Sequence, residues 1–502
     1  MSFEENLGKL RAAYKELNEL SGIMSLLSWD QQVYMPKDGI EVRANQMALL
    51  GGLMHEKATS DELGKIISEL ASQIPDLDAD DDLAREIKLA KKDYDHEHKI
   101  PKELVMERSI LEAQAHSAWV EAKHSNNYPM FEPLLKKTVE LNLRTVEFFK
   151  PYDHPYDILL DQFEPGMKKA EVQAIFEALR PRQIELLQKI AASPQVDDRP
   201  FRNQFPIEPQ KRLGEFISRR MGLPPSRTRL DETEHPFTTE FGRDDVRITT
   251  HYYTDQVLAA LLSTLHEGGH ALYELGLKKA WSGTALGQAT SLGVHESQSR
   301  FWENMIGRSQ PFWEFFHPMM QLEFPAQLEH VSSTEAWRAA NKVEPSFIRI
   351  ESDEVSYNMH IMLRMELELA MIEGRLDTKD LPEAWNAKMK EYLGVVPPTD
   401  TLGCLQDVHW SGGMFGYFPT YALGNLISAQ WWDKMQKDIP HTEEQILRGK
   451  FDEILAWLVK NVHSMSRRYD TQDLLQRVTG ERLNPDYYIN YLKEKYAQIY
   501  SF

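Results

Sequence analysis

Apolar residues recur every three to four positions through most of the chain, which is the spacing of amphipathic helices. The first predicted helix starts at Ser2, because Ser2 and Glu5 fit a capping box. Its apolar face holds Leu7, Leu10, Tyr14, Leu17 and Leu20. We expect this helix to end at Trp29–Pro36, with Trp29 and Met35 packed over its last turn. The first hundred residues are therefore predicted to be helical.

Acidic residues and prolines mark where further helices begin and end. The acidic run Asp76–Glu86 leads into another helix, since carboxylates are favourable near the positive end of a helix dipole. Residues 100–190 predict long helices, interrupted at Pro101, Pro129, Pro133 and the Pro151–Pro155 turn. The segment Ser193–Arg212 is rich in proline and charge. It is either a domain boundary or an elaborated loop within one domain.

A different pattern fills residues 234–253, where Thr, Phe, Tyr, Val and Ile surround a central GRDD. This composition on both sides of a turn predicts a β-hairpin. Alternation along the second strand puts Val246, Ile248 and Thr250 on one face. A strand in this position can hold an extended peptide through its main chain.

The hairpin leads directly into a predicted helix that includes Leu262–Gly276. Thr254 is its expected N-cap, with Asp255 in the first turn. Its packed face consists of Leu258, Leu262, Leu265 and Leu272. Later helices are expected at residues 290–307, 346–373 and 382–393 and from about residue 441. Residues 398–424, dense in Gly and aromatic residues, should form a loop.

The bulk composition narrows the class of protein. The chain has 502 residues, of which 42% are hydrophobic, and a formal net charge of −20. That charge argues against nucleic acid and anionic membranes as partners. The single cysteine, Cys404, suits a reducing compartment. Because we find neither a secretory signal nor a run of about 18 apolar residues, we expect a soluble, cytoplasmic protein.

The chemistry centres on His266, Glu267 and His270, which follow the order H-E-x-x-H. Positions four apart on a helix lie about 40° apart around its axis, so both imidazoles can reach one Zn²⁺. Glu267 then stands beside the ion, where a base for an attacking water belongs. The alternative is a helix with two surface histidines and an acid. Gly268 and Gly269 are costly inside a helix and predict close approach of another backbone or a bound chain.

A catalytic zinc takes three protein ligands and keeps one position open, so the third ligand must come from elsewhere. Glu274 is a poor choice, because ligands on three successive turns fan away from one ion. On the next predicted helix, spacing leaves the choice open between His295 and Glu296. Glu303 shares a face with Glu296 and is the expected acceptor for the N–H of a ligand histidine.

Six separated motifs, joined by WDQQVYMP at Trp29–Pro36, resemble the carboxypeptidase Taq family of metallocarboxypeptidases. The six are HPF at His235–Phe237, DVRIT at Asp245–Thr249, HEGGH at His266–His270, HESQS at His295–Ser299, IRIESD at Ile348–Asp353 and GCLQDVHW at Gly403–Trp410. They occur in order over most of the chain. Ser352 stands where the family usually has Ala, which is a small change.

The resemblance implies a mainly α fold, a large helical zincin-like subunit with a deep groove, akin to neurolysin and angiotensin-converting enzyme. One small β-hairpin or sheet should lie beside the H-E-x-x-H helix. We expect one catalytic domain over residues 1–502, with the helices of residues 1–100 as a wall or lid of the groove. The resemblance also implies homodimers, peptide substrates, and Zn²⁺ or sometimes Co²⁺ as the metal.

Carried onto this sequence, the resemblance makes His266, His270 and Glu296 the metal ligands and Glu267 the general base. It thereby decides the third ligand, which spacing left open.

The remaining site residues are expected to bind the substrate. His409 and Tyr421 are candidates for stabilising the tetrahedral oxyanion, by chemistry and by similarity to the family. Arg349 and Arg247, which lie inside family-like motifs, are candidates for gripping the terminal carboxylate, and His235 could assist. The alternatives are local ion pairs, of Arg349 with Asp353 and of Arg247 with Asp245.

The predicted activity is the removal of single amino acids from the C-terminus of peptides, with broad specificity. Two other functions compete with it. One is an oligopeptidase of the neurolysin type, which cleaves internal bonds of short peptides with the same chemistry. The other is a helical scaffold whose zinc is structural.

Overall fold

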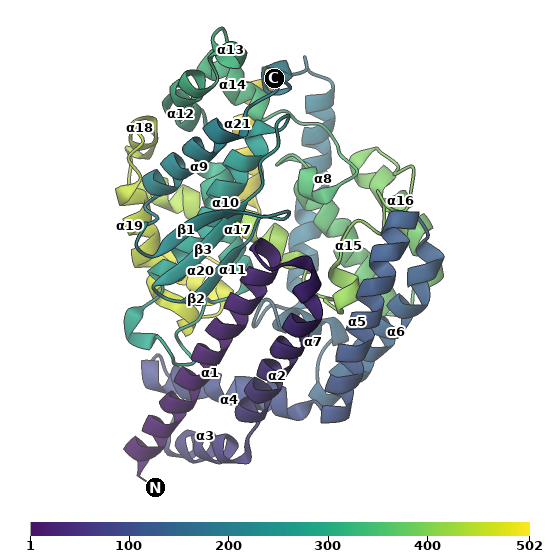
Figure 1. The fold of residues 1–502 in the computed structure, drawn as a ribbon, viewed down its shortest axis with the longest axis vertical. Helices are drawn as coiled ribbons and strands as arrows, with labels where there is room; N and C mark the ends of the chain where they lie inside the picture. Colours follow the sequence, from purple (N-terminus) through teal and green to yellow (C-terminus); the bar gives the residue numbers. More distant parts are fainter. Residues whose placement is uncertain (1) are drawn as a thin grey trace.

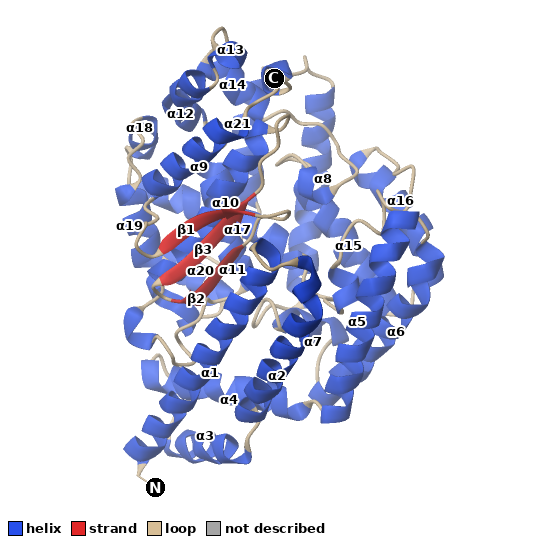
Figure 2. Cartoon of the chain, in the orientation of Figure 1, coloured by secondary structure: helices blue, strands red, loops and turns tan. Residues whose placement is uncertain are grey.

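A computed structural model describes residues 2–502, and helices make up most of it (Figures 1 and 2). The helices of the first half are α1 (Phe3–Val33), α2 (Ile40–Ala58), α3 (Asp61–Gln73), α4 (Asp82–Lys99), α5 (Lys102–Ser125), α6 (Tyr128–Val146), α7 (Pro155–Asp161), α8 (Lys169–Ala191) and α9 (Ile207–Met221). At the start of α1, the predicted capping box is present, with Glu5 N–H donating to Ser2 Oγ. Trp29 is buried near its end. The prediction of helices over the first hundred residues is confirmed.

Two of the prolines expected to interrupt helices lie within α6 instead. Pro129 occupies its first turn, where a missing N–H costs nothing. Pro133 lies in the second turn, and the helix continues because Phe131, Leu135 and Val139 anchor it in the core. In the proline-rich segment, α9 begins at Ile207, earlier than expected, and Phe201 and Phe205 are buried in the main hydrophobic cluster.

The sheet has three strands, β1 (Thr228–Glu232), β2 (Thr238–Gly242) and β3 (Asp245–Thr250), in the order β1-β3-β2 (Figure 2). β2 and β3 form the predicted antiparallel hairpin, and Val246, Ile248 and Thr250 are buried. β1 pairs in parallel with β3 and lies outside the prediction. Its sequence, TRLDE, is mostly charged, so only its pairing with β3 identifies it as a strand.

The helix after the sheet, α10 (Val257–Gly276), starts later than predicted, and its N-cap is Gln256 rather than Thr254. The backbone before it is held by distant residues. Thr254 C=O accepts from Phe205 N–H at 2.6 Å, and Tyr253 C=O accepts from Gln210 Nε2 at 2.8 Å. These contacts keep residues 253–254 out of the helix.

The remaining helices complete the second half of the chain. They are α11 (Leu292–Arg300), α12 (Gln310–Glu323), α13 (Pro325–Leu328), α14 (Ser333–Ala340), α15 (Tyr357–Ile372), α16 (Leu381–Leu393), α17 (Pro419–Asp438), α18 (Thr442–Leu447), α19 (Asp452–Asn461), α20 (Thr471–Thr479) and α21 (Asp486–Tyr500). A π-helical turn, Phe301–Ile306, continues α11, so the helix expected at residues 290–307 is largely confirmed.

Two predictions in this half were wrong at their boundaries. α15 begins at Tyr357 rather than near residue 346. Residues 354–356 form a turn before it, and the Asp353 carboxylate accepts from the N–H groups of Val355 and Ser356 in that turn. Residues 419–424 were expected in a loop but form the first turns of α17, whose first residue is Pro419.

The hydrophobic core of the described residues divides into one large cluster, a small one, and a third of only three residues, Leu104, Leu111 and Leu141, on α5 and α6. The large one reaches from α5 to α21 and surrounds α10, α11 and α17. The small one joins α1, α3 and α4, which lie at the lower end of Figure 1 together with α2. Among residues 2–502, no helix has an apolar stretch long enough to span a bilayer.

Candidate active site

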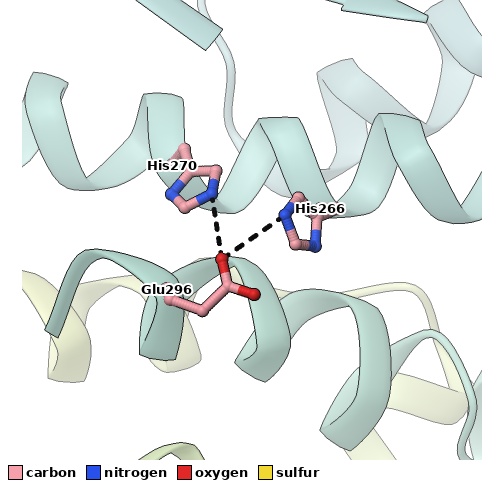
Figure 3. A group of neighbouring side chains, drawn as sticks. All are labelled: His266, His270 and Glu296. Carbon is pink, nitrogen blue, oxygen red and sulfur yellow. Dashed lines mark ion pairs between the residues drawn. The ribbon is translucent and has the colours of Figure 1, made fainter. Parts of the chain in front are cut away.

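The H-E-x-x-H residues lie on α10, and Glu296 faces them from α11. Figure 3 shows His266 and His270 on one helix pointing toward the Glu296 carboxylate on the other. Glu296 Oε2 lies 3.6 Å from His266 Nε2 and 3.4 Å from His270 Nε2. One ligand atom from each residue falls within 4.8 Å of the other two, close enough to share a single ion.

The two glycines of HEGGH allow the close packing that the sequence predicted. A Cβ at Gly269 would lie 2.8 Å from Ser299 Cα and would strike the Gln298 carbonyl oxygen, so α11 can approach only because this position is Gly. A Cβ at Gly268 would lie 2.6 Å from Met221 Cε on α9. On the far side of α11, a Cβ at Gly424 of α17 would lie 2.7 Å from Glu296 Cβ. Glu296 is therefore held between α10 and α17.

Both histidines use their Nδ1 atoms for other contacts, which leaves Nε2 for an ion. His266 Nδ1 lies 2.9 Å from Glu303 Oε2, so Glu303 takes the supporting place expected of it. His270 Nδ1 lies 2.6 Å from His295 Nδ1, and His295 Nε2 lies 2.8 Å from Glu274 Oε1. His295 and Glu274 therefore support His270, and Glu296, not His295, lies beside the two Nε2 atoms.

Glu296 is kept ionised by its neighbours. Arg300 Nε donates to Glu296 Oε1 at 2.7 Å, and Ser299 Oγ donates to Oε2 at 3.0 Å. Burial opposes ionisation, but the charges of Arg300 and His266 hold the pKa of Glu296 well below its usual range. For His270, burial lowers the pKa to about 3, so its imidazole is neutral, as a metal ligand must be.

Glu267 lies on the flank of the same helix face and is buried. Thr238 Oγ1, at the start of edge strand β2, donates to Glu267 Oε2 at 2.7 Å and to the Glu267 carbonyl at 2.9 Å. Burial raises the pKa of Glu267 above its ordinary value. A carboxylate with a raised pKa, oriented beside a candidate ion, is suited to accept and return a proton.

The donor set fits a catalytic divalent metal. Two imidazoles and one carboxylate form the His₂Glu combination typical of hydrolytic zinc, and each histidine is fixed through its second nitrogen. An ion held by three residues keeps a coordination position free for solvent or substrate.

A second group of charges surrounds Asp407. Arg349 donates from Nε and Nη2 to Asp407 Oδ1 at 3.0 and 2.9 Å, and Arg364 donates from Nε to Oδ2 at 2.7 Å. Burial opposes ionisation of Asp407, but the two guanidinium groups hold its pKa far below the usual range. Because two cations share one anion in the buried interior, this group carries a formal charge of +1.

Arg349 was expected to bind either the terminal carboxylate of the substrate or Asp353. Asp353 has other partners, so the prediction of a local ion pair is wrong. Asp353 accepts from Ser356 Oγ at 2.7 Å and from Ser356 N–H at 2.9 Å, in the turn before α15. Arg349 lies in a short 3₁₀ turn, Arg349–Glu351, and reaches Asp407 across the fold.

His409 and Tyr421 lie next to this group. His409 Nε2 is 3.2 Å from Tyr421 Oη, and the Arg349 guanidinium lies 4.6 Å from the centre of the Tyr421 ring. Burial lowers the pKa of His409 to about 4, so its ring is neutral. The two oxyanion candidates are thus in contact with one another and with Arg349.

Tyr357 joins the two parts of the site. Its hydroxyl accepts from Arg349 Nη1 at 2.9 Å, and its ring lies 4.3 Å from the guanidinium of Arg300, which holds Glu296. The tyrosine therefore contacts both the arginine that supports the metal cluster and the arginine of the charged group.

Arg247 is engaged by residues other than those of this second group. Arg247 donates to Asp245 at 2.9 and 2.8 Å, as the alternative predicted, and stacks between Trp29 and Phe241, with ring centres 4.4 and 4.5 Å away. It fastens the end of α1 to the sheet. His235 is exposed just before β2.

Several residues of the site were not singled out from the sequence: Thr238, Arg300, Tyr357, Arg364 and Asp407. Asp407 could have been identified from the sequence, because it lies in the motif GCLQDVHW, two residues before His409. Arg300 lies four residues after Glu296 on the same helix, so helical spacing could have identified it. Thr238 and Tyr357 give no local signal, because their roles depend on contacts with distant segments.

Comparisons with known proteins agree with this arrangement. The family model for carboxypeptidase Taq (M32) metallopeptidase matches residues 9–496. Carboxypeptidase 1 from Bacillus subtilis is 40% identical over 97% of each chain, and thermostable carboxypeptidase 1 from Thermus thermophilus is 41% identical over 97% of this chain and 99% of the relative. The crystal structure of an M32 carboxypeptidase from Deinococcus radiodurans superposes with a TM-score of 0.96, at 38% identity, over 99% of this chain and all of the other.

These findings favour a carboxypeptidase over both alternative functions, the oligopeptidase and the structural-zinc scaffold. They also agree with the helical fold and the small sheet, and a metallopeptidase binds a divalent metal. The chain belongs to the carboxypeptidase Taq (M32) family of metallopeptidases and is a metallocarboxypeptidase.

Proposed function

We propose that this enzyme removes single amino acids from the C-terminus of peptides, with His266, His270 and Glu296 holding Zn²⁺. Co²⁺ is the expected substitute. A divalent ion held by these three residues would supply a Lewis acid for the scissile carbonyl and would lower the pKa of a water toward neutrality. The His₂Glu donor set and the supporting contacts of Glu303 and His295 favour this assignment.

Glu267 is the proposed general base and acid. Its carboxylate takes the proton of the attacking water and later returns it to the leaving amine. Thr238 Oγ1 donates to Oε2 and so fixes the orientation of the carboxylate. Thr238 begins β2, the edge strand of the sheet, so the same segment can also hydrogen-bond the substrate backbone.

Arg349 is the proposed anchor for the terminal carboxylate. Three of its N–H groups donate to Asp407 and Tyr357, and the fork geometry leaves one N–H on each terminal nitrogen for a further acceptor. The net positive charge of the Arg349–Arg364–Asp407 group favours an anion in this place. This charge excess beside the metal cluster is the observation that carries the proposal of an exopeptidase.

His409 and Tyr421 are proposed to stabilise the oxyanion. If the neutral His409 donates from Nε2 to Tyr421 Oη, the tyrosine O–H is free to donate toward the substrate. Tyr421 is only partly buried, which fits contact with a substrate. His235 and Arg247 stay candidates for assisting at the terminal carboxylate, and Arg247 is the weaker one because it is already paired with Asp245.

We also propose that residues 1–502 form one catalytic domain in which the N-terminal helices are a wall of the groove. Residues of α1, α2, α3 and α4 line a cavity of about 760 Å³ against the C-terminal end of α10. Homodimers, implied by the family resemblance, and a cytoplasmic location, favoured by the single cysteine, stay predictions.

A pair of peptides tests the proposed function. One has a free C-terminal carboxylate, and the other is identical but ends in an amide. The free peptide should lose residues one at a time from its C-terminus, and the amide should be cleaved far more slowly. Equal rates, or cleavage at internal bonds, would show that Arg349 does not select a terminal carboxylate.

A further inference from the structure

A fully buried carboxylate, Glu164, lies outside the active site but touches the helix that carries Glu296. Glu164 stands in the turn that follows α7, and its side chain has no exposed surface. Its Oε2 accepts from Gly293 N–H, in the first turn of α11, at 2.9 Å. Its Oε1 accepts from the hydroxyl of Thr471 at the start of α20. The carboxylate therefore bridges the N-termini of two helices.

The first turn of α11 is fixed by partners on every free N–H. Leu292 N–H donates to the Phe163 carbonyl at 3.0 Å, Gly293 N–H to Glu164, and Val294 N–H to Ser291 Oγ at 3.0 Å. Ser291 Oγ also lies 2.9 Å from Thr471 Oγ1. Two of these partners, Phe163 and Glu164, are neighbours in one turn. That turn therefore fixes the position of α11 along its axis and its rotation about that axis.

Gly293 has no room for a side chain at this contact. A Cβ there would lie 3.1 Å from Glu164 Cδ and would strike Oε2. The tight fit means that α11 cannot shift along its axis without losing the bond to Glu164. Glu296 follows three residues later on the same short helix, so any shift of its first turn moves the carboxylate as well.

We propose that Glu164 is a positioning residue for the metal centre, which holds α11 so that Glu296 meets His266 and His270. The inference rests on the proposed ligand set. A carboxylate is suited to this place, since its negative charge is favourable at the N-terminus of a helix. The burial of that charge is costly, and burial raises the pKa of Glu164 to about 7. A ligand displaced by about 1 Å is enough to weaken a metal site.

The test measures metal affinity rather than activity alone. Glu164→Ala removes the acceptor at the start of α11, whereas Glu164→Gln keeps an oxygen for Gly293 and presents its amide to the Thr471 hydroxyl. We expect Glu164→Ala to raise the dissociation constant for Zn²⁺, measured by competition with a chelator, by about tenfold or more. Glu164→Gln should stay within about threefold of the natural protein.

The matched control is Glu368→Ala. Glu368 is also fully buried and has a pKa raised by burial to about 7, but it binds Tyr156, Trp410 and Gly416 in the other half of the site. Its loss should leave the zinc dissociation constant within about threefold, although it removes three buried hydrogen bonds where the loss of Glu164 removes two. The visible absorption of the Co²⁺-loaded protein gives a second readout, and it should change for Glu164→Ala only.

Equal effects of the two alanine variants on metal affinity, or none for Glu164→Ala, would overturn the inference. If Glu164→Ala does not fold, Gly293→Ala tests the same contact from the other side. Its methyl group should weaken zinc binding similarly, and unchanged affinity would refute the role. Glu296→Gln is measured in parallel. If that variant binds zinc normally, the ligand assignment itself is wrong, which is a separate failure.

Discussion

The two halves of the active site are built in different ways. The metal half stands on regular helices, with His266 and His270 four residues apart on α10 and Glu296 on α11. The half that we propose binds the terminal carboxylate, called the carboxylate-binding half below, stands on irregular backbone, because Arg349 lies in a single 3₁₀ turn and Asp407 follows a long loop. Helical geometry positions the first half, whereas buried ion pairs must position the second.

Each half nevertheless has one buried glutamate that ties its backbone down. Glu164 holds the start of α11. Glu368 accepts from Trp410 Nε1 at 2.8 Å and Gly416 N–H at 3.1 Å, on either side of the turn that follows His409. The segment after His409 is therefore held by hydrogen bonds at Trp410 and Gly416, although it is not part of a long helix. Variants of the two halves should therefore lose different properties, metal binding in one and recognition of the C-terminus in the other.

The largest effect is expected from Glu267→Gln. The amide keeps the shape of the side chain but cannot accept the proton of the attacking water. We expect kcat to fall by about 10²- to 10⁴-fold, while the zinc dissociation constant changes little. Steady-state kinetics on an unblocked peptide and zinc titration of the same preparation measure the two quantities. A comparable loss of zinc would make Glu267 a ligand instead.

Arg349→Lys should damage only the carboxylate-binding half. The lysine keeps the charge beside Asp407 but loses the planar fork. We expect kcat/KM for a peptide with a free C-terminus to fall by about 10- to 100-fold, from the loss of a charged hydrogen bond of about 1.5–3 kcal/mol. The slow rate on the amidated peptide should not change. A proportional loss on both peptides would remove Arg349 from carboxylate recognition.

Glu303→Gln should damage only the metal half, and less severely. The amide oxygen can still accept from His266 Nδ1, but the negative charge that strengthens this ligand is gone. Zinc should bind about tenfold more weakly. The ratio of rates on free and amidated peptides should stay constant, and a change in that ratio would mean that the halves are not separable.

The smallest effect concerns the pH dependence of stability. Because burial raises the pKa of Glu164 to about 7, the native state binds this proton more tightly than the unfolded chain does. Its contribution therefore makes stability fall as pH rises from about 4.5 to 7, and the loss levels off above that range. Glu164→Gln removes the ionisation.

Urea unfolding of the metal-free proteins at pH 6 and pH 8 measures this contribution. From pH 6 to pH 8, the free energy of unfolding of the natural protein should fall by about 1 kcal/mol more than that of Glu164→Gln. Identical losses would show that Glu164 titrates as an ordinary exposed acid.

The sequence predicted the metal half better than the carboxylate half, and the reason is physical. His266, Glu267 and His270 are related by helical spacing. The two glycines between Glu267 and His270 predicted the close approach of another backbone, which is that of α11. Spacing alone left His295 and Glu296 as equally good candidates for the third ligand. Packing of α11 between α10 and α17 decides which of them faces His266 and His270. The family resemblance was needed for that choice.

The errors lie where distant contacts override local pattern. Thr254 has the chemistry of an N-cap, but its carbonyl is bound by Phe205, so α10 starts later. Arg349 and Asp353 have the spacing of a helical pair, but Asp353 accepts from Ser356 in the turn before α15, and Arg349 reaches Asp407. Neither outcome can be derived from a window of neighbouring residues.

The most direct test follows the products of one unblocked peptide over time, with metal-depleted protein and with the same protein after zinc is restored. Single residues should leave the C-terminus in sequence, and only after zinc is added. Residues lost equally well by the metal-depleted protein, or fragments cut from the interior of the peptide, would contradict a centre in which an ion on His266, His270 and Glu296 works beside a carboxylate anchor.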